Sequence, residues 1–181
     1  ASGHRGGFVF AALKLLGYTN VRNLAGGLGA WKKASLSVVT GSLPESPAAI
    51  GAPIVEDQAL FDTLNGFFTA LPDDFYAVKS DKLAEALTSS TPPTIIDIRT
   101  TEEFAKDGYI EGAVNVPMQE IFASLDKLPA MDAPIVINCV SGHRGSITAM
   151  GLRLMGYTNV VNLAGGLNAW KSAGLPVSGL V

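Results

Sequence analysis

The sequence predicts an α/β fold in which a mainly parallel sheet is covered by helices on both faces. Short apolar runs of strand length alternate along the chain with segments of helical periodicity. The two central runs, 94–98 and 134–138, are almost continuously apolar, which is typical of strands buried on both faces. Apolar residues make up 48% of the 181 residues and charged residues only 16%, so the chain can bury a substantial core.

The first elements follow in order from residue 75. Ser80 is a suitable cap for a helix through Leu83 and Leu87, which the prolines at 92 and 93 end. Acidic residues after Thr101 favour the start of a short helix, because they lie near the positive end of its dipole. The other predicted elements of this half are strands over 94–98 and 112–117 and a helix over 121–128.

The second half of the domain continues the alternation. The strand over 134–138 leads directly into Cys139. The helix after it has one apolar face, and a glycine is well placed to cap its C-terminus. The predicted elements are this helix, with Ile147, Met150, Leu154, Met155 and Gly156, a strand over 160–163, and a last helix with Leu167 and Trp170 that ends near Gly174 and Pro176.

A long internal repeat indicates a duplicated domain. Residues 2–38 align without gaps to residues 141–177, and 24 of the 37 aligned positions are identical. In this register Ala1 aligns with Val140, so the first copy contains no counterpart of Cys139. We expect either a fragment of a tandem protein or a half-domain that another chain completes.

The domain organisation follows from the repeat. Residues 1–40 are the C-terminal part of a first copy, 41–74 are a linker and an amphipathic helix, and 75–181 are a complete domain. The linker is rich in Gly, Pro and Ser, and Leu60, Leu64, Phe67 and Phe68 recur at helical spacing after it. Because residues 8–16 are strongly apolar, we expect them to pack on the second domain, to pair between chains, or to bind a complementing fragment.

Composition argues against several classes of function. The net charge of −3 and the lack of a basic stripe predict no nucleic-acid partner. No apolar run is long enough for a transmembrane helix, so we expect no membrane partner and a cytoplasmic location, or a periplasmic one after removal of a signal peptide. One cysteine excludes an internal disulfide, and with only two histidines no metal site is expected.

The segment Cys139-Val140-Ser141-Gly142-His143-Arg144-Gly145 carries the chemistry. It joins a buried strand to a helix, so successive backbone N–H groups and the helix start favour an anion there. Thiolate is the nucleophilic form of cysteine, and this setting favours it. We therefore expect Cys139 to be a nucleophile, the backbone of Val140–Gly145 to be its cradle, and Arg144 to attract an anionic substrate.

The chain resembles the rhodanese family over residues 75–177. The motifs that carry the resemblance are the loop CVSGHRG, Asp97-Ile98-Arg99, Gly108-Tyr109-Ile110-Glu111-Gly112-Ala113, and the segment NLAGGLNAW at 162–170. Tyr109 departs from the family, which usually has histidine there. The resemblance implies a rhodanese-like fold and a sulfurtransferase that works through a Cys139 persulfide, without a metal or organic cofactor. A small anionic sulfur donor such as thiosulfate, and a thiophilic acceptor such as cyanide, a thiol or a protein cysteine, are the implied partners.

Two other functions stay open. A persulfide carrier or protein-binding module would share the same loop without efficient turnover. The second alternative is a cysteine phosphatase or arsenate reductase, which the resemblance disfavours. Four residues separate Cys139 from Arg144, and family resemblance links a loop one residue longer to the phosphatases.

Other polar and aromatic residues have simpler interpretations. His143 is either a general base or, as we expect, a solvent-facing residue that tunes the local charge. Ser141 either donates a hydrogen bond to sulfur or only turns the loop. Asp97 and Arg99 are expected to hold a strand end to a neighbouring loop. Trp31 and Trp170 are expected to anchor the core.

Overall fold

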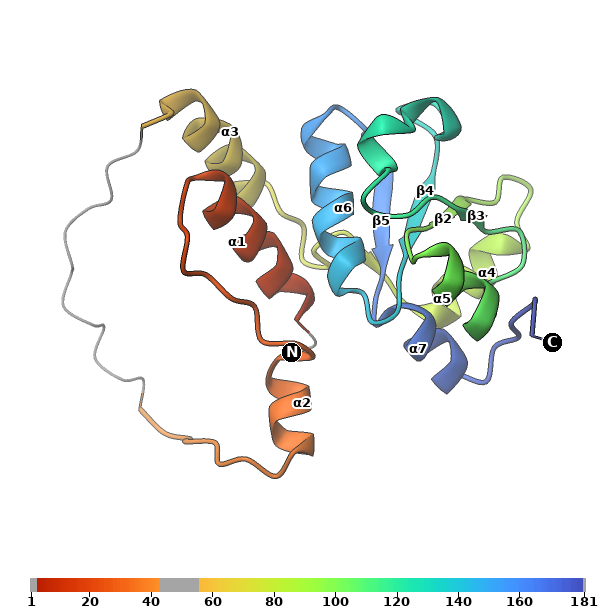
Figure 1. Cartoon of the computed structure of the whole chain (residues 1–181), viewed down its shortest axis with the longest axis horizontal. Coiled ribbons are helices and arrows are strands. Elements are labelled where there is room, and N and C mark those ends of the chain that lie inside the picture. The colour runs from red at the N-terminus through yellow and green to blue at the C-terminus, as the bar shows by residue number, and fades with distance from the viewer. Residues whose placement is uncertain (1–2, 43–55, 181) are drawn as a thin grey trace.

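The structure is a computed structural model and describes residues 3–42 and 56–180. Five parallel strands form one sheet in the order β1-β5-β4-β2-β3, which confirms the predicted α/β class (Figure 1). The strands are β1 (Ala77–Val78), β2 (Thr94–Asp97), β3 (Val114–Asn115), β4 (Ile135–Asn138) and β5 (Val160–Leu163).

The register of the central strands positions the functional end of the sheet. All four residues of β4 are buried, as the apolar run predicted, and β4 lies between β2 and β5. Asp97 of β2 pairs with Asn138 of β4, so both strands end at the same edge of the sheet. Cys139 is the next residue, and it therefore emerges at the carboxyl edge, where parallel sheets bind ligands.

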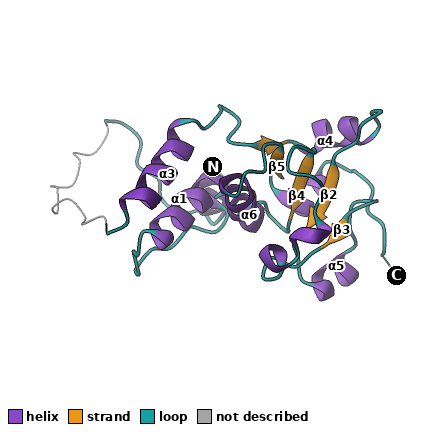
Figure 2. Cartoon of the chain, turned by 90° about the horizontal axis from the view of Figure 1, so that it is seen from above, coloured by secondary structure: helices purple, strands orange, loops and turns teal. Residues whose placement is uncertain are grey.

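Helices cover both faces of the sheet (Figure 2). On one face, α6 (His143–Leu154) contributes Ala149 and Leu152 to a core cluster with the central strands. On the other face, α4 (Ser80–Leu87) and α7 (Gly166–Ser172) contribute Leu83 and Trp170 to a second cluster. The prediction of Trp170 as a core anchor is confirmed.

Two local predictions are wrong. The helix expected over 121–128 is two 3₁₀ turns, Ile121–Ala123 and Leu125–Lys127, because Ser124 between them has a non-helical backbone (φ −127°, ψ 35°). Ser80 is the first residue of α4 rather than its cap, a position that Lys79 takes, and the Ser80 hydroxyl is buried without a partner among the described residues. The short helix predicted near Thr101 is present as α5 (Thr101–Asp107).

The N-terminal copy keeps the helices of the repeat but not its strand. α1 (His4–Leu15) and α2 (Gly27–Lys33) lie at the same offset of 139 residues from α6 and α7. Residues 21–24, which correspond to β5, form no strand. All five strands of the described chain therefore come from the second copy.

α1 and α3 (Gln58–Thr69) pack on the outer side of α6 (Figures 1 and 2). Phe8 and Ala12 of α1, Leu64 of α3 and Met150 of α6 form a third buried apolar cluster. Of the three expectations for residues 8–16, the structure shows packing on the second copy. Most of the predicted linker lies outside the described residues.

Positions that are buried in the second copy are exposed in the first. The exposed fraction is 38% for Trp31 and 3% for the equivalent Trp170, and it is 50% for Leu24 and 0% for the equivalent Leu163. The prediction that Trp31 anchors a core is wrong for this structure, because no strand of the first copy covers it in the described ranges.

Candidate active site

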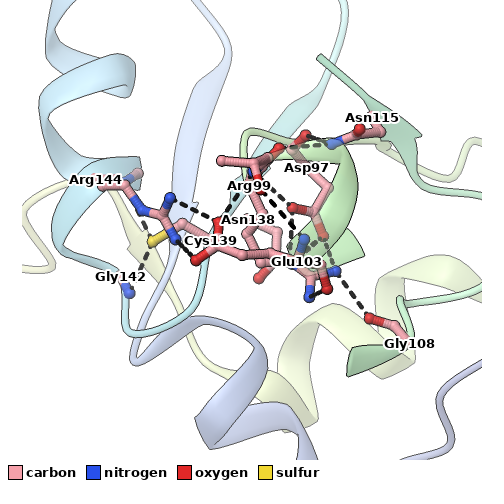
Figure 3. Close-up of polar contacts among 11 residues, drawn as sticks. Asp97, Arg99, Glu103, Gly108, Asn115, Asn138, Cys139, Gly142 and Arg144 are labelled. Atoms are coloured by element: carbon pink, nitrogen blue, oxygen red, sulfur yellow. Dashed lines mark hydrogen bonds and ion pairs between the residues drawn. The ribbon is translucent and has the colours of Figure 1, made fainter. Parts of the chain in front are cut away.

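Cys139 lies between the end of β4 and the start of α6, and its sulfur faces backbone amides (Figure 3). The N–H of Gly142 donates to Sγ at 3.1 Å and the N–H of Gly145 donates at 3.4 Å. Only 1% of the residue is exposed. Hydrogen bonds to sulfur from fixed donors stabilise the negative charge of a thiolate.

The shape of the loop depends on a second turn that packs against it. The N–H groups of Leu167 and Asn168 donate to the carbonyl oxygens of Cys139 (2.8 Å) and Val140 (3.0 Å). Gly142 has φ +81°, and a Cβ atom there would lie 2.9 Å from the backbone nitrogen of Gly165. A side chain at position 142 would therefore strain the backbone and displace the turn.

The other predicted loop residues are placed at different depths. Ser141 is exposed, and within the described ranges its hydroxyl makes no hydrogen bond to the Cys139 sulfur. Val140 is half-buried. His143 is also half-buried rather than solvent-facing, because it begins α6 beside the N-terminal copy, where the Asn23 amide nitrogen lies 3.3 Å from its Nε2 atom. Burial, and then the charge of Arg144, lower the pKa of His143.

Arg144 forms an ion pair that the sequence analysis did not predict. Its two terminal nitrogens donate to the two carboxylate oxygens of Glu103, each at 2.8 Å. These hydrogen bonds lower the pKa of Glu103 and raise that of Arg144. The positive charge expected to attract the substrate is thus already paired, although each side chain is still 33% exposed.

Glu103 also stabilises the start of α5. Its carboxylate accepts from the Thr100 N–H, and the Thr100 hydroxyl accepts from the Glu103 N–H, so the two residues form a capping box. The spacing Thr-x-x-Glu is visible in the sequence and could have indicated this cap. No local pattern could have indicated the pair with Arg144, which is 41 residues away.

A buried ion pair fixes the neighbouring strand end. Asp97 and Arg99 are both fully buried, and the Arg99 guanidinium donates to the Asp97 carboxylate, with a shortest distance of 2.7 Å. Arg99 also donates to the carbonyl oxygens of Glu103 and Gly108, and Asn138 donates to Asp97. The arrangement matches the structural role expected of Asp97 and Arg99, because it joins β2, β4 and α5 beneath the Cys139 loop.

Two features are absent from residues 3–42 and 56–180. No group of three or more His, Cys, Asp or Glu side chains is placed to hold a metal ion there. No helix in these ranges has the length and apolar character needed to cross a membrane.

Comparison with known proteins agrees with the fold. A sulfurtransferase from Allochromatium vinosum is 36% identical over 100 residues, which cover 55% of this chain and 92% of that protein. A thiosulfate sulfurtransferase from Corynebacterium glutamicum is 29% identical over 195 aligned positions, which cover 90% of this chain and 58% of that protein. The crystal structure of a rhodanese-like domain protein from Staphylococcus aureus superposes with a TM-score of 0.50 at 33% identity, covering 56% of this chain and 97% of that chain.

The family match falls on the second copy. Residues 80–173 match the family model of the rhodanese-like domain. This span holds every element from α4 to α7, including the Cys139 loop. The chain therefore belongs to the rhodanese-like family.

Proposed function

We propose that the protein is a sulfurtransferase that carries sulfur as a persulfide on Cys139. The observation that carries the proposal is the pair of backbone N–H groups, from Gly142 and Gly145, that donate to the Cys139 sulfur. A persulfide needs stabilisation of one negative sulfur, and fixed amides supply it without reorganisation. Relatives named as sulfurtransferases support this class of reaction.

The first half-reaction loads the sulfur. The thiolate of Cys139 attacks the outer sulfur of thiosulfate, a new S–S bond forms, and the S–S bond within thiosulfate breaks. Sulfite leaves with the electron pair, so no external oxidant or reductant is needed. The resulting persulfide anion has its charge on the outer sulfur, next to the loop amides.

The second half-reaction unloads it. A thiophilic acceptor such as cyanide attacks the outer sulfur, the Cys139 S–S bond breaks, and thiocyanate leaves while the thiolate is restored. A small-molecule thiol or a protein cysteine would take the sulfur in the same way. We propose that the acceptor approaches at the surface end of the loop, where Ser141 is exposed and Val140 is half-buried.

The ion pair between Arg144 and Glu103 would affect the binding of the anionic donor. Arg144 has five N–H donors, and Glu103 accepts one from each of its two terminal nitrogens. We propose that the donor competes with Glu103 for Arg144 at the mouth of the loop.

The N-terminal copy has a proposed partner of its own. We propose that a segment with the strand and helix pattern of residues 75–139, from another polypeptide, covers the face that includes Leu24, Leu28 and Trp31. The equivalent residues of the second copy are buried by such a segment. Adding a polypeptide of residues 75–139 to a Trp170→Phe variant should shift the Trp31 emission to shorter wavelength, and no shift would refute this partner.

The main test combines turnover with intact mass. Incubation with thiosulfate should add the mass of one sulfur atom at Cys139, and cyanide should then release thiocyanate catalytically. Cys139→Ser should abolish both results, with Ser89→Ala, at an exposed position outside the loop, as a control that keeps them. A persulfide without turnover would favour a carrier, and hydrolysis of an aryl phosphate without persulfide would favour the phosphatase.

A further inference from the structure

Asn162 connects the N-terminal copy to the loop of Cys139. It lies on β5, is fully buried, and was not singled out from the sequence. Its Nδ2 atom donates to the carbonyl oxygen of Gly142 at 2.8 Å and lies 2.7 Å from the Nδ1 atom of His4. One amide nitrogen therefore links the catalytic loop to a histidine 158 residues away in the chain.

The hydrogen bonds determine the proton positions. The Gly142 carbonyl can only accept, so the Asn162 NH₂ group must face it. His4 Nδ1 must then accept the second N–H, and its proton lies on Nε2. That proton is donated to the Phe75 carbonyl at 2.8 Å. Burial lowers the pKa of His4, which agrees with a neutral ring.

The backbone on the other side of His4 is held in an uncommon conformation. Phe75 and Tyr76 have φ values of +54° and +52°, which residues other than glycine rarely adopt. The Tyr76 carbonyl accepts from the backbone N–H of Asn162 at 2.8 Å. His4 thus closes a ring of contacts with Phe75, Tyr76 and Asn162.

An equivalent contact joins the asparagine of the first copy to the histidine of the second. Asn23, the repeat counterpart of Asn162, donates to the Gly3 carbonyl at 3.1 Å and lies 3.3 Å from Nε2 of His143. Each copy therefore places its histidine against the asparagine of the other. The contact at Asn162 is the shorter and more buried of the two, and it is the one that touches the Cys139 loop.

We infer that His4 is a positioning residue for Cys139, and that it acts through Asn162. By holding one N–H of Asn162, His4 directs the other N–H to the Gly142 carbonyl. This fixes the carbonyl group of Gly142, and the N–H of the same residue, which belongs to the preceding peptide unit, donates to the Cys139 sulfur. For sulfur transfer the inference rests on the proposed function, whereas for Cys139 reactivity it stands on the contacts alone.

Two substitutions at position 4 separate the contacts of His4. His4→Asn keeps an acceptor at the position of Nδ1 and loses the Nε2 donor, whereas His4→Gln keeps a donor near Nε2 and loses the acceptor. We expect iodoacetamide to alkylate Cys139 about tenfold more slowly in His4→Gln and within about twofold of wild type in His4→Asn. The kcat/KM for sulfur transfer should follow the same order.

Arg5→Ala is the matched control. The Arg5 guanidinium lies over the Phe75 ring, 5.1 Å from its centroid, so its loss perturbs the start of α1 without touching Asn162. Its alkylation rate should equal that of wild type. If His4→Gln does not fold, the side-chain amide signals of Asn162 in the wild-type NMR spectrum replace the assay, and they should shift as His4 titrates.

Equal alkylation rates in the two His4 variants, or Asn162 signals that ignore the His4 titration, would overturn the inference. So would an Arg5→Ala protein as slow as His4→Gln. If the alkylation rates follow the predicted order but the protein forms no thiocyanate, the role of His4 is supported and the sulfurtransferase proposal is rejected.

Discussion

Cys139 lies in a cradle of backbone amides, and the cation of the same loop, Arg144, is paired with Glu103. Because Gln preserves a capping box, Glu103→Gln should remove the negative charge while keeping the start of α5. A half-exposed ion pair is worth up to about 1 kcal/mol, so the KM for thiosulfate should fall about two- to fivefold at unchanged kcat. Steady-state kinetics test this, with the exposed Glu102→Gln as control, and an unchanged or higher KM would contradict it.

His4 should make the free energy of unfolding depend on pH. Its pKa in the folded protein is below the ordinary value of 6.5, mainly through burial, with Arg5 lowering it and Asp74 raising it. The unfolded chain therefore binds more protons between the two pKa values, so the free energy of unfolding should fall as the pH is lowered through 6.5. The neutral His4→Asn should show a smaller fall, although His143 shifts in the same direction. Urea unfolding across this pH range measures both, and an equal fall in both proteins would refute the assignment.

At the scale of elements, β2, β4 and α5 are joined by the buried pair of Asp97 and Arg99. Asp97→Asn leaves the Arg99 charge buried without its counter-ion, so the free energy of unfolding should fall by about 3–5 kcal/mol. Glu85→Gln breaks the exposed Lys82–Glu85 pair and should change it by less than about 1 kcal/mol. Urea unfolding of both variants is the measurement, and similar losses in the two would show that the buried pair is not essential.

The whole molecule has an outer helical layer, α1 and α3, that depends on a small apolar cluster around Phe8. Phe8→Ala removes a fully buried ring and should cost about 3–5 kcal/mol, most of it in this layer. Hydrogen exchange should therefore accelerate in α1 and α3 more than in β4. Val9→Ala, at an exposed position of α1, is the control and should change little. Equal acceleration in the layer and the sheet would show that the two unfold as one unit.

The same helical layer also contacts the active site, through His4 at the start of α1. Loss of α1 docking would withdraw His4 from Asn162, so Phe8→Ala should also slow the alkylation of Cys139. If α1 is loosened and the alkylation rate of Cys139 is unchanged, the docking of α1 does not control the reactivity of Cys139.

The sequence by itself determined the α/β class, the two central strands, the repeat and the position of Cys139 between a strand and a helix. These features depend on local signals, such as an apolar run or a glycine next to a helix start, and the described structure keeps them. The helix predicted over 121–128 failed because one residue, Ser124, leaves the helical conformation in its buried setting.

Tertiary structure alone decided which distant groups meet. Arg144 contacts Glu103 because the strand order brings their segments together. Asn162 contacts His4 because α1 docks on α6. It also decided that Trp31 is exposed while its repeat counterpart Trp170 is buried. The physical reason is that periodicity and capping act over a few residues, whereas burial and long-range pairing depend on which elements cover a side chain.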